Sequence, residues 1–388
     1  MPTVSEWQRA LSQAYHLNLQ STQELCNDVS SRKRAKELQT GRQRYRAKDL
    51  TPWPSPHGRR DTVEVRPIDI LHSLGRITTP PITELIDLSS TWAEIRYLWA
   101  FRPNLQSRWI PSLRLNDSVK LLDFHQKTLL SDELGVGFAA YYMTRFERAT
   151  DPVDVFLARR SAQVQLRGTS RRSLPDYIFR GRRPDQYFIV ECKGTQGTSS
   201  SAINQLVRAA EQVVTVGLHS PAITTHLVIG SLLSGSISLL IADPEENEEP
   251  PILSEWSTDD LSLFALAKKL SYTGDYAGAS RLLSGLVEEK SDLEFADHEP
   301  DIRKTARDVF QGATEIRRTP DGRELRMFRG MTKIALSMAE SAPIEEAASQ
   351  ETLDDRERPF VLESDLYGDS ALVRSISPDG SLFEVEVR

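Results

Sequence analysis

The sequence predicts an α/β protein organised around one buried strand, Tyr187 to Gly194. Its first four residues are large and apolar or aromatic, which is typical of a central strand covered on both faces. Another strand-like run, Ser173 to Phe179, precedes it. The intervening Arg180 to Gln186 is rich in turn residues, so the two runs should form a β-hairpin. From about Asp132 to Ala242 the order is helix, strand, hairpin, helix and strand, which predicts a core over residues 117–245.

Residues 1–60 are expected to form a basic N-terminal helix and arm, with the helix from Val4 to Leu19. Eight positive charges stand against two acids between Arg32 and Asp49. The proline-rich Thr51 to Gly58 that follows cannot be a regular helix or a central strand. The basic run fits a DNA-contacting arm, and it fits equally a solvated helix face that leads into a linker.

Residues 61–116 are expected to form a mostly helical N-terminal lobe. Ile68 to Leu74 and Thr91 to Phe101 have the spacing of amphipathic helices. Four of the six tryptophans lie between Asp49 and Asp117, so this segment should pack a core of its own or pack against the following unit. A structural role is favoured, and target recognition is the alternative.

The core should begin with a helix from Ser131 to Met143, in which Ser131 is the N-cap and acids occupy the first turn. Val153 to Leu157 and Ala162 to Leu166 are the candidates for the first strand, ahead of the hairpin. The helix and strands after the hairpin complete the sheet.

After the hairpin comes a loop rich in glycine and serine, which lacks the Gly-Lys-Ser/Thr ending of a P-loop. We expect Ser201 to cap a helix from Ala202 to Val216, whose apolar residues face the core. Strands are expected at Thr225 to Gly230 and at Ser238 to Ala242.

The charged residues at the end of the central strand should act together. Glu191 and Lys193 point to the same face because strand side chains alternate. If the hairpin turn is centred near Arg183, Asp176 lies opposite Val190 and beside Glu191. Two carboxylates and a lysine then converge. A structural ion pair at the strand end is the alternative interpretation of Glu-x-Lys.

This set of residues suits hydrolysis of a phosphodiester. Asp176, Glu191 and the backbone carbonyl of Cys192 could supply the hard oxygen ligands that Mg²⁺ or Mn²⁺ prefers. Lys193 could orient or deprotonate the attacking water, or stabilise charge on the phosphate oxygens. A second Pro-Asp pair ends at Asp185, which is excluded because six residues of strand place it ~20 Å from Glu191.

Pro175-Asp176 followed by Glu191-Cys192-Lys193 resembles the signature of the PD-(D/E)xK nuclease superfamily, over about a third of the chain. The resemblance implies a restriction-endonuclease-like αβββαβ core. It also implies a metal-reaching glutamate near the start of the first helix, a place that Glu133 matches; a carboxylate favoured by the helix dipole is the alternative. Gln205 matches the first position of a supporting Gln-x-x-x-Tyr pattern, although Ala209 stands where the tyrosine would be.

The charge distribution suits a polyanionic partner, although the net charge is −7. Between Arg159 and Arg183 there are eight arginines and a single acid, Asp176. A solvated arginine-rich hairpin is the alternative interpretation. The residues expected to contact nucleic acid are Arg171, Arg172, Arg180, Arg182 and Arg183.

Beyond an acidic linker, residues 256–290 should form a helical hairpin that resembles a single tetratricopeptide-type repeat. A solenoid needs about three repeats, so packing or docking is its expected role. Residues 300–388 are expected to be an α+β region with hairpins at two Pro-Asp-Gly turns. Within it, Ala342 to Arg358 should be a mobile loop.

No apolar run reaches the ~18 residues that a membrane span requires, and the N-terminus lacks a signal-peptide pattern. The two cysteines, Cys26 and Cys192, suggest neither a disulfide framework nor a zinc site. We therefore expect a cytoplasmic protein without a membrane partner.

These observations predict a Mg²⁺- or Mn²⁺-dependent DNA endonuclease. The resemblance suggests restriction or anti-phage defence, and a homodimer or an assembly with partner subunits. Two alternatives keep the same fold: a DNA-repair or RNA-cleaving nuclease, and a DNA-binding or assembly subunit with an inactive nuclease-like fold. A metal-independent nuclease that uses His125, His219 or His226 is the weakest alternative.

Overall fold

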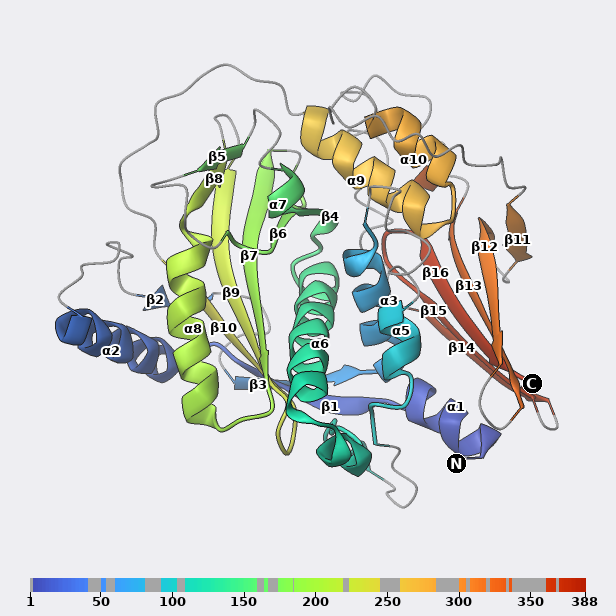
Figure 1. Ribbon diagram of the computed structural model, residues 1–388, viewed down its shortest axis with the longest axis horizontal. Helices are drawn as coiled ribbons and strands as arrows, with labels where there is room; N and C mark the ends of the chain where they lie inside the picture. Colours follow the sequence, from blue (N-terminus) through green and yellow to red (C-terminus); the bar gives the residue numbers. More distant parts are fainter. Residues whose placement is uncertain are drawn as a thin grey trace. The chain divides into compact units, whose positions relative to one another are not determined.

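The computed structural model divides the chain into two compact units (Figure 1). Unit 1 comprises Met1–Tyr15, Val65–Pro111 and Ser262–Arg388, and unit 2 comprises His16–Glu64 and Ser112–Leu261. The structure describes residues 3–40, 50–53, 60–80, 92–102, 109–158, 164–166, 174–183, 185–218, 223–244, 259–283, 300–304, 308–318, 322–332, 335–336, 361–367 and 370–388.

This division differs from the segments expected from the sequence. Residues 16–64 belong to the same unit as the expected core over residues 117–245, because strands from the N-terminal segment extend the core sheet. Most of the expected lobe over residues 61–116 belongs instead to the unit that contains the C-terminal strands.

Unit 2 is a mixed α/β structure built on an eight-stranded sheet of order β3-β1-β10-β9-β7-β6-β4, with β2 paired to β10. The β7–β9 and β1–β10 pairs are parallel, and the β6–β7 and β9–β10 pairs are antiparallel. A separate two-stranded sheet joins β5 and β8. The strands are β1 Tyr15–Gln20, β2 Leu50–Thr51, β3 Arg60–Val65, β4 Thr150–Asp154, β5 Val164–Leu166, β6 Tyr177–Arg180, β7 Gln186–Thr195, β8 Val216–Leu218, β9 Ile223–Leu232 and β10 Ser238–Pro244.

The predicted central strand is confirmed. β7 lies between β6 and β9, and its residues Tyr187 to Cys192 are all buried. The two strands predicted after it are also found, as β9 and β10. The first strand of the core lies three residues earlier than the candidate Val153 to Leu157: β4 ends at Asp154, a short helix α7 (Val155–Ala158) follows, and β5 pairs outside the main sheet.

The N-terminal segment contains a strand that we had predicted as helix. Helix α1 (Val4–Ser12) ends well before the expected Leu19, and β1 follows it. The residues of β1 alternate between buried and half-buried, which is the pattern of a strand with one covered face. Parallel pairing of β1 with β10 makes these residues part of the core sheet.

The helices of unit 2 include α2 (Gln23–Thr40), α6 (Phe124–Arg145) and α8 (Ser199–Val213), with a 3₁₀ turn η2 (Asp117–Leu121) before α6. Helix α8 begins earlier than predicted, because Thr198 rather than Ser201 is its N-cap. It buries the apolar residues expected to face the core, apart from the half-buried Val214.

Helix α6 also begins earlier than predicted. Its N-cap is Asp123, whose side chain accepts a hydrogen bond of 2.8 Å from the Gln126 amide. Ser131 therefore lies inside the helix, where its hydroxyl donates to the Lys127 carbonyl at 2.7 Å. The expectation that Ser131 caps the helix, with acids in its first turn, is wrong because an Asp-x-x-Gln cap lies upstream.

Unit 1 combines helices with a six-stranded antiparallel sheet of order β11-β12-β13-β16-β15-β14. Its other helices are α3 (Pro67–Thr78), α5 (Trp92–Tyr97), α9 (Asp259–Tyr272) and α10 (Tyr276–Leu283), which include the two amphipathic helices and the helical hairpin that were predicted. The strands are β11 Asp301–Lys304, β12 Val309–Arg318, β13 Glu324–Thr332, β14 Val361–Tyr367, β15 Ser370–Ile376 and β16 Ser381–Val387.

Both predicted Pro-Asp-Gly hairpins are present in this sheet. Gly322 and Gly380 have φ of 86° and 80°, a left-handed conformation that glycine adopts without strain. The described part of residues 300–388 is mostly strand, with helical residues at 335–336, and helices from earlier segments pack on the sheet, as α1 and α3 do against β15. Residues 342–358 lie outside the described ranges.

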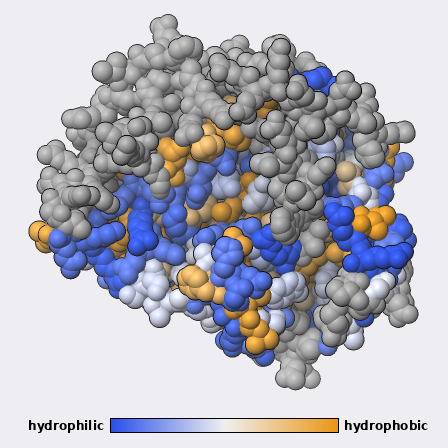
Figure 2. Space-filling view, viewed as in Figure 1, coloured by the Kyte–Doolittle hydropathy of each residue, from blue (hydrophilic) through white to orange (hydrophobic). Residues whose placement is uncertain are grey.

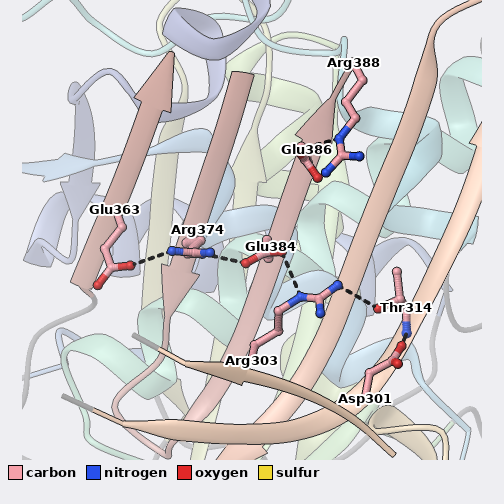
Figure 3. A network of polar contacts seen from close by, with 8 residues as sticks. All are labelled: Asp301, Arg303, Thr314, Glu363, Arg374, Glu384, Glu386 and Arg388. Atoms are coloured by element: carbon pink, nitrogen blue, oxygen red, sulfur yellow. Dashed lines mark hydrogen bonds and ion pairs between the residues drawn. The ribbon is translucent and has the colours of Figure 1, made fainter. Parts of the chain in front are cut away.

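A ladder of charged side chains crosses this sheet (Figure 3). Glu384 of β16 pairs with Arg374 of β15 at 2.5 Å and with Arg303 of β11 at 3.3 Å. Arg374 also pairs with Glu363 at 3.1 Å. The neighbouring strands β14, β15 and β16 are thus joined by side chains as well as by the backbone, and the contact with Arg303 reaches β11, which is not a neighbour of β16 in the sheet. Among the described residues, no helix combines the length and apolar character needed to cross a membrane.

Candidate active site

Glu191 and Lys193 lie side by side at the end of β7, as the alternation of strand side chains predicted. The Glu191 side chain is 0% exposed and that of Lys193 is 25% exposed. The Lys193 ammonium donates a hydrogen bond to Glu191 Oε1 and forms an ion pair with it. One carboxylate is therefore enclosed in the protein with its counter-charge at the edge of solvent.

Asp176 meets Glu191 directly, through a register one residue away from the predicted one. Tyr177, rather than Asp176, pairs with Val190, so the residue before Tyr177 lies level with Glu191. Asp176 Oδ2 accepts a hydrogen bond of 2.8 Å from the Cys192 amide. The Asp176 carbonyl accepts another, of 3.0 Å, from the Val155 amide at the end of β4. The side chain of Asp176 is thus joined to β7, and its backbone is joined to the residue that follows β4.

The electrostatics of this cluster favour the binding of a cation. Burial and the neighbouring Asp176 raise the pKa of Glu191 to about 8. Burial likewise raises the pKa of Asp176, although Lys193 and the Cys192 amide oppose this. Desolvation would lower the pKa of Lys193, but Glu191 and Asp176 outweigh it and the pKa is raised. Two carboxylates share one ammonium, so a further cation would favour ionisation of both acids.

The carboxylate oxygens of Glu191 and Asp176 could bind a divalent cation. Glu191 Oε2 is buried and has no hydrogen-bond partner within the described part of the chain. A buried oxygen without a partner is costly, and a hard cation would satisfy it. Asp176 is the second carboxylate, and the Cys192 carbonyl remains the predicted third ligand. Within the described ranges, no three His, Cys, Asp or Glu residues are arranged as a metal site.

Glu133 does not occupy the place expected for it. It lies about ten residues into α6 and is half-buried, so it is neither at the start of the helix nor in a position to interact with the helix dipole. The adjacent Asp132 interacts electrostatically with Lys193 and with Asp176. Partial burial raises the pKa of Asp132, while Lys193 opposes that shift. Asp132 is therefore an acid of α6 that lies within electrostatic range of the cluster.

Sequence reasoning missed Asp132, although a signal for it existed. Ser131, Gly135 and Ala139 are small residues spaced four apart, which marks the face of a helix that approaches a neighbour closely. Asp132 borders that face. A second residue that was missed is Gln196, just after β7, whose amide donates to the Lys127 carbonyl at 3.1 Å and to Ser131 Oγ at 3.0 Å.

The remaining predicted residues are not brought into the cluster. Gln205 is half-buried on α8, and no hydrogen bond joins it to the cluster within the described residues. Arg182 and Arg183 are exposed at the hairpin turn, and Arg183 pairs with Asp185 at 3.7 Å. At ~3.3 Å per strand residue this turn lies more than 15 Å from Glu191, the argument that excluded Asp185.

Arg180 is half-buried on β6, opposite Tyr187. Arg171 and Arg172 lie outside the described residues. Of the three histidines considered as alternatives, His226 is buried with its Nε2 2.9 Å from the Val216 carbonyl oxygen, and His125 is exposed on α6. His219 lies outside the described residues.

Comparison of the chain with protein-family models, with curated proteins and with solved structures yielded no match. The function is therefore argued from the residues and their arrangement.

Proposed function

We propose that this protein is a divalent-cation-dependent endonuclease that hydrolyses phosphodiester bonds in DNA. The observation that supports this most directly is the juxtaposition of the half-buried Asp176 and the buried Glu191, with Lys193 on the same strand face. A buried acid that has an unpartnered oxygen and lies beside a second acid has no evident structural benefit, since apolar residues would pack there at lower cost. Its retention suits a catalytic site.

The order of elements in unit 2 supports a restriction-endonuclease-like core. Helix α6, strands β4, β6 and β7, helix α8 and strand β9 follow the αβββαβ order, and β9 runs parallel to β7. The Pro175-Asp176 and Glu191-Cys192-Lys193 motifs lie on β6 and β7 or beside them, where the resemblance to PD-(D/E)xK nucleases requires them.

Each residue of the cluster has a distinct role in this proposal. Asp176, Glu191 and the Cys192 carbonyl would hold Mg²⁺ or Mn²⁺, which when bound supplies positive charge and lowers the pKa of a bound water. Lys193 would donate a hydrogen bond to the attacking water or to a phosphate oxygen, and its ammonium would offset the charge that develops there. Asp132 would support Lys193 from α6.

The biological setting is proposed on the resemblance alone. Restriction or anti-phage defence is the favoured setting, with DNA as the partner and a homodimer or larger assembly as the expected form. DNA repair and RNA cleavage use the same chemistry. An inactive assembly subunit is disfavoured because Asp176, Glu191 and Lys193 are all retained.

Cleavage of supercoiled plasmid by the purified full chain, with Mg²⁺, Mn²⁺ or EDTA, tests the proposal. Wild type should nick or linearise the plasmid only with metal, and Asp176→Ala and Lys193→Ala should each lose at least ~10²-fold in rate. Asp185→Ala is the matched control, because it removes the aspartate of the other Pro-Asp pair on the same hairpin. The proposal fails if wild type cleaves neither DNA nor RNA, or if Asp176→Ala retains full activity.

A further inference from the structure

Helix α2 extends beyond the part of unit 2 against which it packs. Its buried residues recur on one face and end at Lys33: Leu25, Cys26, Val29, Ser30 and Lys33. The described side chains after Lys33 are all exposed. The seven residues from Arg34 to Thr40 correspond to ~10 Å of helix. In Figure 1 this helix extends beyond α8, and in Figure 2 mainly hydrophilic residues cover its outer end.

The outer part of α2 is basic in a chain whose net charge is −7. Arg32, Lys33, Arg34 and Lys36 fall within five positions. Basic residues in the last turn of a helix would be explained by the helix dipole. The last turn of α2 contains none, and it contains the acid Glu37. The dipole therefore does not explain these charges, which suit a polyanionic partner in addition to their contacts within the protein.

Arg32 attaches this basic stretch to the start of α8. Its Nη1 donates to the Ser200 carbonyl at 3.0 Å, to Ser200 Oγ at 2.8 Å and to Asn204 Oδ1 at 3.2 Å. Helix α8 follows β7 after a short loop, so its first turn leads directly from the strand that contains Lys193. The position of α2 is thus tied to the candidate active site.

The chain from Lys193 to Ser200 limits the distance between the candidate active site and the point where Arg32 contacts α8. Ser200 is the seventh residue after Lys193, and a fully extended chain of that length spans at most ~25 Å. One strand of B-DNA rises 3.4 Å per nucleotide, so ~25 Å corresponds to about seven base pairs. A duplex bound at Lys193 therefore lies less than one turn of B-DNA from the point where Arg32 of α2 contacts α8.

We propose that the exposed basic residues of α2, Arg34 and Lys36, contact the phosphate backbone of nucleic acid bound at the Asp176–Glu191–Lys193 cluster. This inference rests on the proposed function. The contact is independent of base sequence, because Lys and Arg at an exposed helix end contact phosphates rather than a defined set of base edges. It adds a binding surface to the arginine-rich hairpin, and it favours the DNA-contacting interpretation of the basic run that begins at Arg32.

Binding in EDTA tests this surface separately from cleavage. The double variant Arg34→Ala/Lys36→Ala is compared with Arg317→Ala/Arg318→Ala, which removes the same charge from exposed positions on β12. Fluorescence anisotropy with a labelled duplex of about 30 bp, over about 50 to 200 mM salt, gives the affinity and its salt dependence. The α2 variant should bind roughly tenfold more weakly, with a log–log salt slope smaller by about 1.8. The control should match wild type.

The outcomes separate the two proposals. An unchanged affinity and slope in the α2 variant, with metal-dependent cleavage intact, overturns the surface and leaves the nuclease. A reduced slope without any cleavage supports the surface and refutes the nuclease. Wild type that binds no duplex overturns the surface. If wild type binds vesicles that contain phosphatidylserine, and the α2 variant loses that binding but not duplex binding, the surface recognises anionic lipid and the proposal is wrong.

Discussion

Gly135 of α6 and Gly194 of β7 meet backbone to backbone. A Cβ atom on Gly135 would lie 2.8 Å from the Gly194 amide nitrogen, and one on Gly194 would lie 1.8 Å from the Ser131 carbonyl oxygen. Two side chains are absent so that a helix and a strand can touch directly after Lys193. This contact brings Asp132, one residue after Ser131, to the side of the cluster.

Gly194→Ala should destabilise unit 2, because the methyl group meets backbone atoms that cannot move without separating α6 from β7. We expect a loss of about 3 kcal/mol in the free energy of unfolding, measured by urea denaturation. Gly322→Ala is the control: it has open space around it, and only its left-handed φ costs about 1 kcal/mol. Equal stability of Gly194→Ala and wild type would show that the close contact is not formed.

Asp132→Asn should slow plasmid cleavage, whereas Glu133→Gln should not. Asp132 acts on Lys193 and Asp176, and we expect a roughly tenfold or larger loss of rate when its charge is removed. Glu133 is its neighbour in sequence with the same charge, so it controls for general effects on α6. Loss of activity in Glu133→Gln alone would restore the prediction made from the sequence.

Glu94→Gln should make unit 1 more stable towards high pH. Burial raises the pKa of Glu94 from its ordinary 4.5 to about 8, and Arg329 only partly opposes the shift. An acid with a raised pKa stabilises the fold fully below pH 4.5, and this contribution is lost as pH rises through about 8. The variant should therefore gain stability relative to wild type across that window, by a few kcal/mol at most. Urea unfolding between pH 5 and 9 measures the difference, with Glu386→Gln, at a half-buried position, as control. A difference that does not change with pH would show that Glu94 is not buried as an acid.

Glu384→Ala should destabilise the C-terminal sheet far more than Glu386→Ala. Glu384 is buried and joins Arg374 to Arg303, so its removal leaves two arginines without their shared carboxylate (Figure 3). We expect a cost of about 3 kcal/mol. Among the described residues, Glu386 pairs with the half-exposed Arg388 just after the same strand, and its loss should cost under about 1 kcal/mol. Thermal unfolding of the two variants measures this, and equal losses would contradict the role of the ladder.

Local patterns predicted much of what surrounds the candidate site. The apolar run Tyr187 to Val190 indicated a central strand, and the alternation of side chains placed Glu191 and Lys193 together. Turn residues located the hairpin, and the two Pro-Asp-Gly turns located the strands of the C-terminal sheet. These features depend on residues close in sequence, so the information was local.

Other features were misjudged because competing local signals were close in strength. The start of α6 was placed at Ser131, since serine followed by acids is a good cap, while the Asp123 cap lay upstream. Because the helix start was misplaced, Glu133 was considered as a site residue and Asp132 was not. The register of Asp176 was off by one residue because a turn rich in arginine and glycine does not define its own centre.

The sequence by itself determined the class of the fold, the central strand and the identity of the three charged residues on which the proposed chemistry depends. Tertiary structure alone decided that residues 16–64 extend the core sheet, that Asp132 comes within electrostatic range of Lys193, and that α2 is anchored beside α8 through Arg32. The reason is physical. Strand pairing and helix packing join residues many tens of positions apart, and the periodicity of one segment does not predict which distant segment it contacts.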